Sequence, residues 1–189
     1  MASDTPFKPT KEELHRALGR RIPDLIATGL DVLFCGINPG LYSGATRKHF
    51  ARPGNRFWKA LHGAGFTDRV LSPFEQGEML ARRLGITNVV NRTTVAAADL
   101  TDDELRRGGA NLRRKVMRFK PKFLAVLGVG AYRVGFGAAK ASVGPQDETI
   151  GATKVWVLPN PSGLNANYQL PALIEVFTEL RRASGARGR

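Results

Sequence analysis

Two asparagines stand where a neutral side chain could take part in chemistry. Asn38 lies in Ile37-Asn38-Pro39-Gly40, and Asn160 is flanked by two prolines and followed by Ser162-Gly163. A carboxamide offers an acceptor and two donors without charge, so it can orient a water molecule or read the edge of a nucleic-acid base. An Asn-Pro-Gly sequence is also ordinary turn chemistry, which is the better interpretation for either copy alone. Two copies, each at the end of an apolar run in a very basic chain, favour a functional site.

Both asparagines need strands to position them. Short apolar runs occur at 32–37, 86–90, 123–127 and 155–158, and helical patterns separate them. Parallel strands would bring both asparagines to one edge of the sheet, where open α/β sheets bind ligands. The sequence therefore predicts an α/β fold, a three-layer α/β/α sandwich with a central, mainly parallel sheet of four to five strands. A minor strand at 149–150 would be the fifth.

Helix boundaries are signalled by capping boxes, in which a Ser or Thr precedes a Glu by three residues. These pairs are Thr10/Glu13, Ser72/Glu75 and Thr101/Glu104. We expect the second helix to reach about residue 84 and the third to end at Pro121, weakened or bent at Gly108-Gly109. We expect a single domain over 1–189, with a frayed start at 1–9 and a flexible basic tail at 183–189.

The net charge of the chain indicates the chemical class of its partner. The chain has 189 residues with 29 Lys and Arg against 16 Asp and Glu, a formal net charge of +13. Such an excess favours a polyanionic partner, most often nucleic acid, over a protein that is merely basic. The apolar runs are too short to cross a bilayer and no leader is recognisable, so the sequence predicts an intracellular, cytoplasmic or nucleoid-associated protein.

Other chemistries lack their motifs. Cys35 is the only cysteine and lies in an apolar run, so it predicts a buried side chain and neither a disulfide nor a thiolate metal site. His49 has no matching ligand set, and no metal or cofactor is expected. The Gly128-Val129-Gly130 turn does not fit a dinucleotide site, because Arg133 stands at the third glycine position.

Three ordered motifs carry a resemblance to a known family. They are Gly36-Ile37-Asn38-Pro39-Gly40, the segment 50–58 ending in Asn55-Arg56-Phe57-Trp58, and Asn160-Pro161-Ser162-Gly163-Leu164. Together they resemble the mismatch-specific uracil/thymine DNA glycosylases, a branch of the uracil-DNA glycosylase superfamily. The similarity extends from about residue 32 to residue 164, and the final helix fits it as well.

The resemblance implies a monofunctional enzyme that flips uracil, or a related damaged or mismatched pyrimidine, out of duplex DNA and hydrolyses its N-glycosidic bond. Asn38 would hold the attacking water. The base pocket would be formed by Gly36, Ile37, Phe50 and Asn160, with Phe50 stacking on the base. Leu164 would be the wedge that fills the vacated stack, assisted by Ser162, Gly163 and Asn165. The implied partner is double-stranded DNA bound by a monomer, with no obligate protein partner.

Two basic residues beside Phe50, Arg47 and Lys48, are interpreted as phosphate contacts, although a solvated face would look the same. Phe50 itself could be ordinary core, and Leu164 could cap the sheet.

Some positions depart from the family pattern. Ala166 stands where some relatives have an arginine, and Tyr42 stands where a smaller residue is common and could reshape the pocket mouth. Asn88, in Ile86-Thr87-Asn88, resembles the strand end of other superfamily branches and could relax the dependence on a mismatch. We expect both Tyr42 and Asn88 to be pocket residues.

The neutrality of Asn38 leaves the developing positive charge on the sugar without a carboxylate. Asp99 follows the second strand at the same edge and is the candidate to supply one, with helix capping as its alternative role. A rival function is a damage or mismatch sensor of the same fold with little or no turnover. A nucleotide-binding α/β protein would rest on fold analogy alone.

Overall fold

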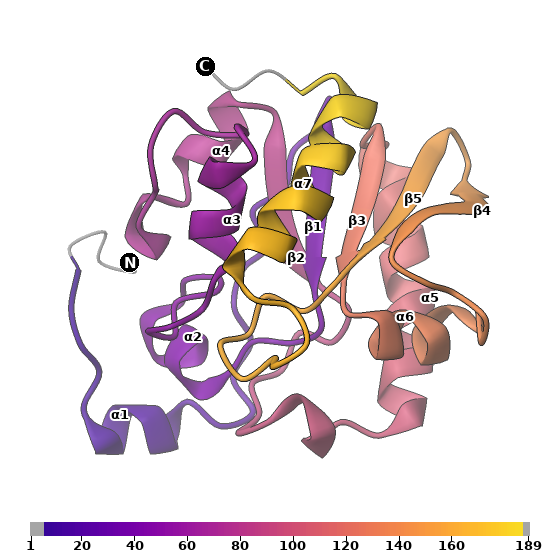
Figure 1. Cartoon of the computed structure of the whole chain (residues 1–189). Helices are drawn as coiled ribbons and strands as arrows, with labels where there is room; N and C mark the ends of the chain where they lie inside the picture. Colours follow the sequence, from indigo (N-terminus) through magenta and orange to yellow (C-terminus); the bar gives the residue numbers. More distant parts are fainter. Residues whose placement is uncertain (1–5, 187–189) are drawn as a thin grey trace.

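The structure, a computed structural model, describes residues 6–186 (Figure 1). Its elements follow one another along the chain, with 3-10 turns written η. They are α1 (Lys11–Arg16), β1 (Val32–Gly36), α2 (Leu41–Thr46), α3 (Phe57–Gly63), η1 (Pro73–Glu75), α4 (Glu78–Ala81), β2 (Leu84–Asn88), η2 (Ala97–Asp99), α5 (Asp102–Phe119), β3 (Phe123–Leu127), α6 (Val129–Phe136), β4 (Gly144–Ile150), β5 (Thr153–Leu158) and α7 (Leu170–Ser184).

The sheet has five strands in the order β2-β1-β3-β5-β4. Strands β2, β1, β3 and β5 are parallel to one another, and the edge strand β4 pairs antiparallel with β5. In Figure 1, α7 crosses in front of this sheet and α5 lies behind it. The predicted α/β sandwich with a central, mostly parallel sheet is therefore confirmed.

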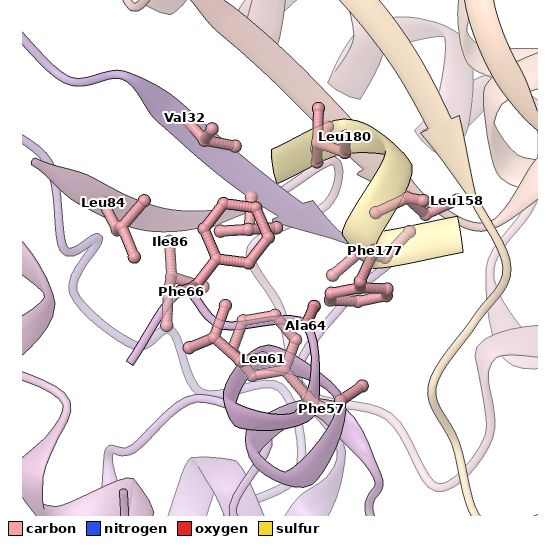
Figure 2. Packing of buried hydrophobic residues seen from close by; sticks show 14 of the residues in the cluster. Val32, Phe57, Leu61, Ala64, Phe66, Leu84, Ile86, Leu158, Phe177 and Leu180 are labelled. Atoms are coloured by element: carbon pink, nitrogen blue, oxygen red, sulfur yellow. The ribbon is translucent and has the colours of Figure 1, made fainter. Parts of the chain in front are cut away.

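Alternate residues of each strand serve the two helix layers, as strand pleating requires. In β1, Val32 and Phe34 face α3 and α7, where Phe34 stacks against Phe177 with ring centroids 6.0 Å apart. Figure 2 shows this cluster closing around Phe66, Leu61 and Phe177. Leu33 and Cys35 face the opposite layer with α5 and α6. Burial on both faces explains why the strands read as continuous apolar runs.

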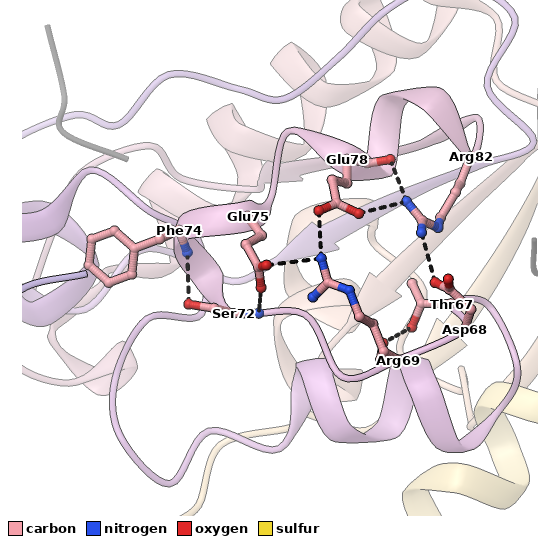
Figure 3. Close-up of polar contacts among 8 residues, drawn as sticks. All are labelled: Thr67, Asp68, Arg69, Ser72, Phe74, Glu75, Glu78 and Arg82. Carbon is pink, nitrogen blue, oxygen red and sulfur yellow. Dashed lines mark hydrogen bonds and ion pairs between the residues drawn. The ribbon is translucent and has the colours of Figure 1, made fainter. Parts of the chain in front are cut away.

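All three capping boxes form as predicted. The helix expected to run from residue 72 to about 84 is wrong, because the chain makes η1, then the four-residue α4, and enters β2 at Leu84. Figure 3 shows what holds this irregular segment: Arg69 bonds Glu75 and Glu78 at 2.9 and 2.7 Å, and Arg82 bonds Asp68 and Glu78 at 2.7 and 3.1 Å. The ion pairs add to the short-range backbone bonds of this segment, such as Met79 N to Gln76 O at 3.1 Å and Arg82 N to Met79 O at 3.0 Å.

The glycine pair in α5 does not interrupt the helix. A Cβ on Gly109 would lie 1.9 Å from the carbonyl oxygen of Gly135 in α6, and one on Gly108 would lie 2.4 Å from that of Val89. The glycines therefore allow α5 to approach its neighbours closely, and the helix continues through them to Phe119.

Two elements are more regular than the sequence suggested. Residues 41–46 form α2, a short helix that no sequence signal described above predicts, and β4 spans seven residues and not only the predicted 149–150. At the ends of the chain, residues 6–9 have no regular structure and residues 183–184 belong to α7 and not to a flexible tail. Gly185 then caps α7 and Ala186 is buried, whereas residues 1–5 and 187–189 lie outside the described residues. Within the described part of the chain, no helix is long and apolar enough to cross a membrane.

Candidate active site

The carboxyl ends of three strands converge on one pocket. Asn38 lies two residues beyond β1, Asn88 ends β2, and Asn160 lies two residues beyond β5. All three line a cavity of about 380 Å³, which also receives Phe50 and Leu164. The sheet thus brings together the asparagines that sequence spacing placed at its edge.

The side-chain amide of Asn38 is fixed in one orientation. Its Nδ2 donates to Thr94 Oγ1 at 2.7 Å, to the Arg92 carbonyl oxygen at 3.1 Å and to the Pro39 carbonyl oxygen at 3.3 Å. The two carbonyl oxygens can only accept, and the Thr94 hydroxyl already donates its proton to the carbonyl oxygen of Ala96 at 2.6 Å. The nitrogen must therefore face this cluster, which leaves Oδ1 to accept a hydrogen bond from a molecule in the pocket.

Phe50 contributes an aromatic surface. Its ring stacks on Phe57 with centroids 4.1 Å apart, so the opposite ring face is turned to the pocket that Phe50 lines. The backbone of Phe50 has a φ of 50°, a left-handed conformation that costs a non-glycine residue about 1 kcal/mol. Neighbouring bonds hold it there, because His49 N donates to Gln76 Oε1 and Ala51 N donates to Ser43 Oγ.

Gly36 is required by the same pocket. A Cβ at this position would lie 2.7 Å from Asn88 Oδ1 and 3.3 Å from the Phe50 ring. A side chain here would occupy the space between the aromatic surface and Asn88.

His49 sets the polarity of Asn88. The His49 ring is 1% exposed, and burial lowers its pKa to about 4, so the ring is neutral at physiological pH. Its Nε2 lies 3.0 Å from the Pro23 carbonyl oxygen, which can only accept, so Nε2 carries the proton and Nδ1 is an acceptor. Asn88 Nδ2 lies 3.4 Å from that Nδ1 and donates to it. The Asn88 oxygen is left on the side of Gly36 and the pocket.

The loop after β5 carries the second motif. Asn160 Oδ1 accepts from Ser162 N at 3.1 Å, and Asn165 Nδ2 donates to the Asn160 carbonyl at 2.9 Å. These bonds fold the loop back on itself and present Leu164, whose side chain is 76% exposed, at the pocket mouth. Ser162 and Asn165 also line the pocket, whereas Gly163 lies in an adjacent hollow against residues 52–56.

Four predicted site residues lie away from the lining. Asp99 is exposed, and its Oδ2 accepts from Ala96 N at 2.9 Å, so the carboxylate caps η2 and the structure places it outside the pocket. Lys48 is only 5% exposed, with Nζ 6.0 Å from the Phe74 ring centroid, which is at odds with a phosphate contact. Arg47 is exposed at the end of α2, and Tyr42 lies within that helix. Asp99 is therefore not proposed as the catalytic carboxylate, and Lys48 is not proposed as a phosphate contact.

Sequence reasoning missed three residues that organise the site. Thr94 anchors Asn38, His49 orients Asn88, and Arg56 bonds the loop that bears Leu164. Each of them bonds a partner more than 35 residues away in the chain, so its role cannot be read from local sequence, although Arg56 itself lies in one of the three motifs quoted above.

The pocket is electrically neutral apart from Arg52. In the described part of the chain no Asp or Glu lines it. Among residues 6–186, no group of three His, Cys, Asp or Glu side chains could hold a metal ion. The arrangement can therefore orient a water, stack a planar ring and present an acceptor to its edge.

Comparisons with known proteins agree with this chemistry. The family model of the uracil DNA glycosylase superfamily matches residues 23–181. Among solved structures, the chain is similar to the NMR solution structure of a Methanosarcina acetivorans protein provisionally named a uracil DNA glycosylase. The two are 18% identical with a TM-score of 0.56, over 86% of this chain and 98% of that one. At this identity the structural likeness supports the fold.

Proposed function

Because the chain belongs to the uracil DNA glycosylase superfamily, we propose that it removes uracil, and related damaged pyrimidines, from DNA, with preference for uracil opposite guanine. The reaction is hydrolysis of the N-glycosidic bond, and the product is an abasic site. The observation that carries the proposal is the fixed Asn38 amide, whose free oxygen faces a pocket with an aromatic wall.

The proposed reaction separates bond breaking from water attack. The bond between sugar C1′ and base N1 breaks, and its electron pair leaves with the base. A water held by Asn38 Oδ1 then adds to the electron-poor C1′, and the proton that it releases neutralises the departed base anion. A neutral amide is too weak a base to remove that proton early, so Asn38 acts by positioning the water.

The base would be recognised by stacking and by one edge. The flipped ring would lie against the open face of Phe50, and the Asn88 oxygen would accept the N3–H of uracil. Cytosine presents an acceptor at N3, so two acceptors would face each other and the normal base would be disfavoured. This edge contact does not involve the opposite strand, which supports activity on unpaired uracil as well as on mismatches.

Preference for guanine as the opposite base has a physical basis. Flipping costs a few kcal/mol and less at a weak pair, so a U·G mismatch opens more easily than a U·A pair. Leu164 would enter the vacated stack and hold the step unstacked. The exposed Arg47 and the net charge of +13 supply the attraction to phosphates.

Duplexes containing U·G or U·A and the corresponding single strand test the proposal. Treatment with the protein and then with alkali breaks the uracil strand only where the base has been released. We expect cleavage in the order U·G above U·A, activity on the single strand, and loss of cleavage in Asn38→Ala. Lys59→Gln, which changes an exposed charge on α3, is the control and should cleave normally.

The rival sensor function predicts a different result. Such a protein would bind the mismatched duplex with strong salt dependence and release no base. Strict dependence on guanine, with no cleavage of U·A or single strands, would refute the role given to Asn88.

A further inference from the structure

One arginine holds the whole loop that bears Leu164. The Nη1 of Arg56 donates to the carbonyl oxygens of Asn165 and Tyr168, both at 2.9 Å, and Nη2 donates to that of Gly163 at 3.2 Å. The carbonyl of Ser162 lies at 3.4 Å from Nη1 as a longer, shared contact. The backbone N–H of Arg56 donates to Pro161 O at 2.9 Å. Five carbonyls between residues 161 and 168 thus converge on a single residue.

The loop is also seated against the chain just before Arg56. A Cβ on Gly163 would lie 2.7 Å from the carbonyl oxygen of Gly54, so the two backbones touch. The loop's own bonds are local. Besides the two bonds to Asn160 described above, Leu164 N donates to Ser162 Oγ at 3.3 Å, Asn165 N donates to Ser162 O at 3.0 Å and Asn167 N donates to Asn165 Oδ1 at 3.1 Å. These bonds shape the turn, whereas the contacts from the segment around Arg56 tie the turn to the rest of the protein.

A loop that drives an apolar side chain into a base stack must resist being pushed back. Leu164 is 76% exposed, so packing of its own side chain cannot hold it in place. The rigidity has to come from the backbone behind it, and that backbone is bonded by the planar guanidinium fork of Arg56.

We propose that Arg56 is a positioning residue that stiffens the 161–168 loop as a wedge support, so that it is needed for opening duplex DNA and not for hydrolysis itself. This inference rests on the proposed function. Lysine cannot replace the fork, because an ammonium is a point charge that cannot span several carbonyls in one plane. The proposed support of the loop therefore depends on the planar geometry of the guanidinium group as well as on its charge.

Hydrogen–deuterium exchange on the full-length protein tests, without any substrate, whether Arg56 stiffens the 161–168 loop. We expect the amides of Leu164 and Asn165 to exchange about tenfold faster or more in Arg56→Gln and in Arg56→Lys than in the wild type, a change of about 1.4 kcal/mol. The β1 and β3 amides should be unchanged, which shows that the variants fold. Lys59→Gln removes an exposed charge from α3, the helix that begins directly after Arg56, and should leave the exchange unaltered.

Cleavage assays test whether Arg56 is needed for opening duplex DNA. Arg56→Lys should lose about tenfold or more in kcat/KM on a U·A duplex and keep its activity on single-stranded uracil, because a single strand has no stack to hold open. Leu164→Ala should show a comparable loss on the U·A duplex, and the double variant should lose no more on that duplex than the worse single one.

The two proposals fail in different ways. If the wild type releases no uracil but the loop amides exchange faster in the Arg56 variants, the glycosylase function is wrong and the loop support stands. If the wild type cleaves and loop exchange is unchanged in both variants, the inference is overturned. Equal losses on duplex and single strand would also overturn it, since they would indicate damage to the pocket.

Discussion

Replacing Asn38 by aspartate separates two views of this site. If the side chain only needs an oxygen that holds water, a carboxylate should serve, and its negative charge should even assist the electron-poor sugar. The hydrogen bonds predict the opposite. Asn38 Nδ2 donates to one hydroxyl oxygen and two carbonyl oxygens, and Asn38→Asp would face all three with an oxygen.

The size of the effect follows from these contacts. A neutral hydrogen bond contributes about 1 kcal/mol net, and a carbonyl left without its donor costs about as much again or more. With contacts of 2.7, 3.1 and 3.3 Å, we expect Asn38→Asp to destabilise the protein by about 3 kcal/mol when the introduced carboxyl group is charged. Protonation would restore one donor, so the surrounding acceptors raise the pKa of that group in the folded state. A raised folded pKa means that the variant's stability is greatest at low pH and is lost as pH rises through that pKa.

Urea unfolding of wild type and variant from about pH 4.5 to 8 measures this, and the abasic-site assay follows activity. The difference in the free energy of unfolding should widen as pH rises, and cleavage of U·G should fall to the level of Asn38→Ala. Asn160→Asp is the matched control, because Asn160 uses its amide oxygen to accept from Ser162 N and a carboxylate keeps that acceptor. It should lose less than about 1 kcal/mol with little pH dependence. A stable, active Asn38→Asp would show that the amide is not oriented by these acceptors.

Three further changes test the architecture. Gly36→Ala should lower kcat/KM about tenfold or more with little change in melting temperature, because its Cβ would fill the pocket; unaltered kinetics would contradict this base position. Gly109→Ala should destabilise by about 1–3 kcal/mol in urea, since its Cβ meets backbone, whereas Gly130→Ala, with open space around it, should be neutral or stabilising. The hydrogen bond from Arg92 lowers the pKa of Glu104 from 4.5 to about 2, so this carboxylate stabilises the fold above about pH 4.5 and loses that effect as pH falls toward 2. The stability deficit of Glu104→Gln in urea should therefore be present at neutral pH and vanish in acid; a deficit independent of pH would refute the ion pair's contribution.

The fold was predictable where local signals are strong. The central strands β1 and β3 are apolar throughout, and each predicted capping box satisfies its own orphan amides, so neither signal depends on distant contacts. The sequence was less informative where elements are short or polar. Residues 72–84 divide into η1 and α4 with Gly77 between them, and β4 carries the polar residues of an edge strand, which weaken its pattern.

The candidate site likewise has features that the sequence predicts and features that it does not. Asn38 and Asn160 could be found because a polar side chain after a buried strand is conspicuous. Their orientation could not, since it is set by Thr94 and Ser162, and that of Asn88 by His49. Asp99 was a reasonable candidate by position along the chain, yet its carboxylate is bound to a backbone amide of its own loop.

The absence of a carboxylate from the described pocket lining has a chemical consequence. Without a fixed negative charge beside the sugar, the site offers little stabilisation of positive charge at C1′, so hydrolysis depends more on the stability of the departing base and on the phosphates of the DNA. The contacts assigned to Phe50 and Asn88 would act on that base, and Asn38 would act on the water that arrives afterwards. Such a site achieves its effect by geometry, since an amide that cannot take a proton must have its oxygen in the right place before the bond breaks. The three hydrogen bonds that fix Asn38 would supply this rigidity, whereas the arginine that bonds the loop across the pocket mouth would serve the opening of the duplex.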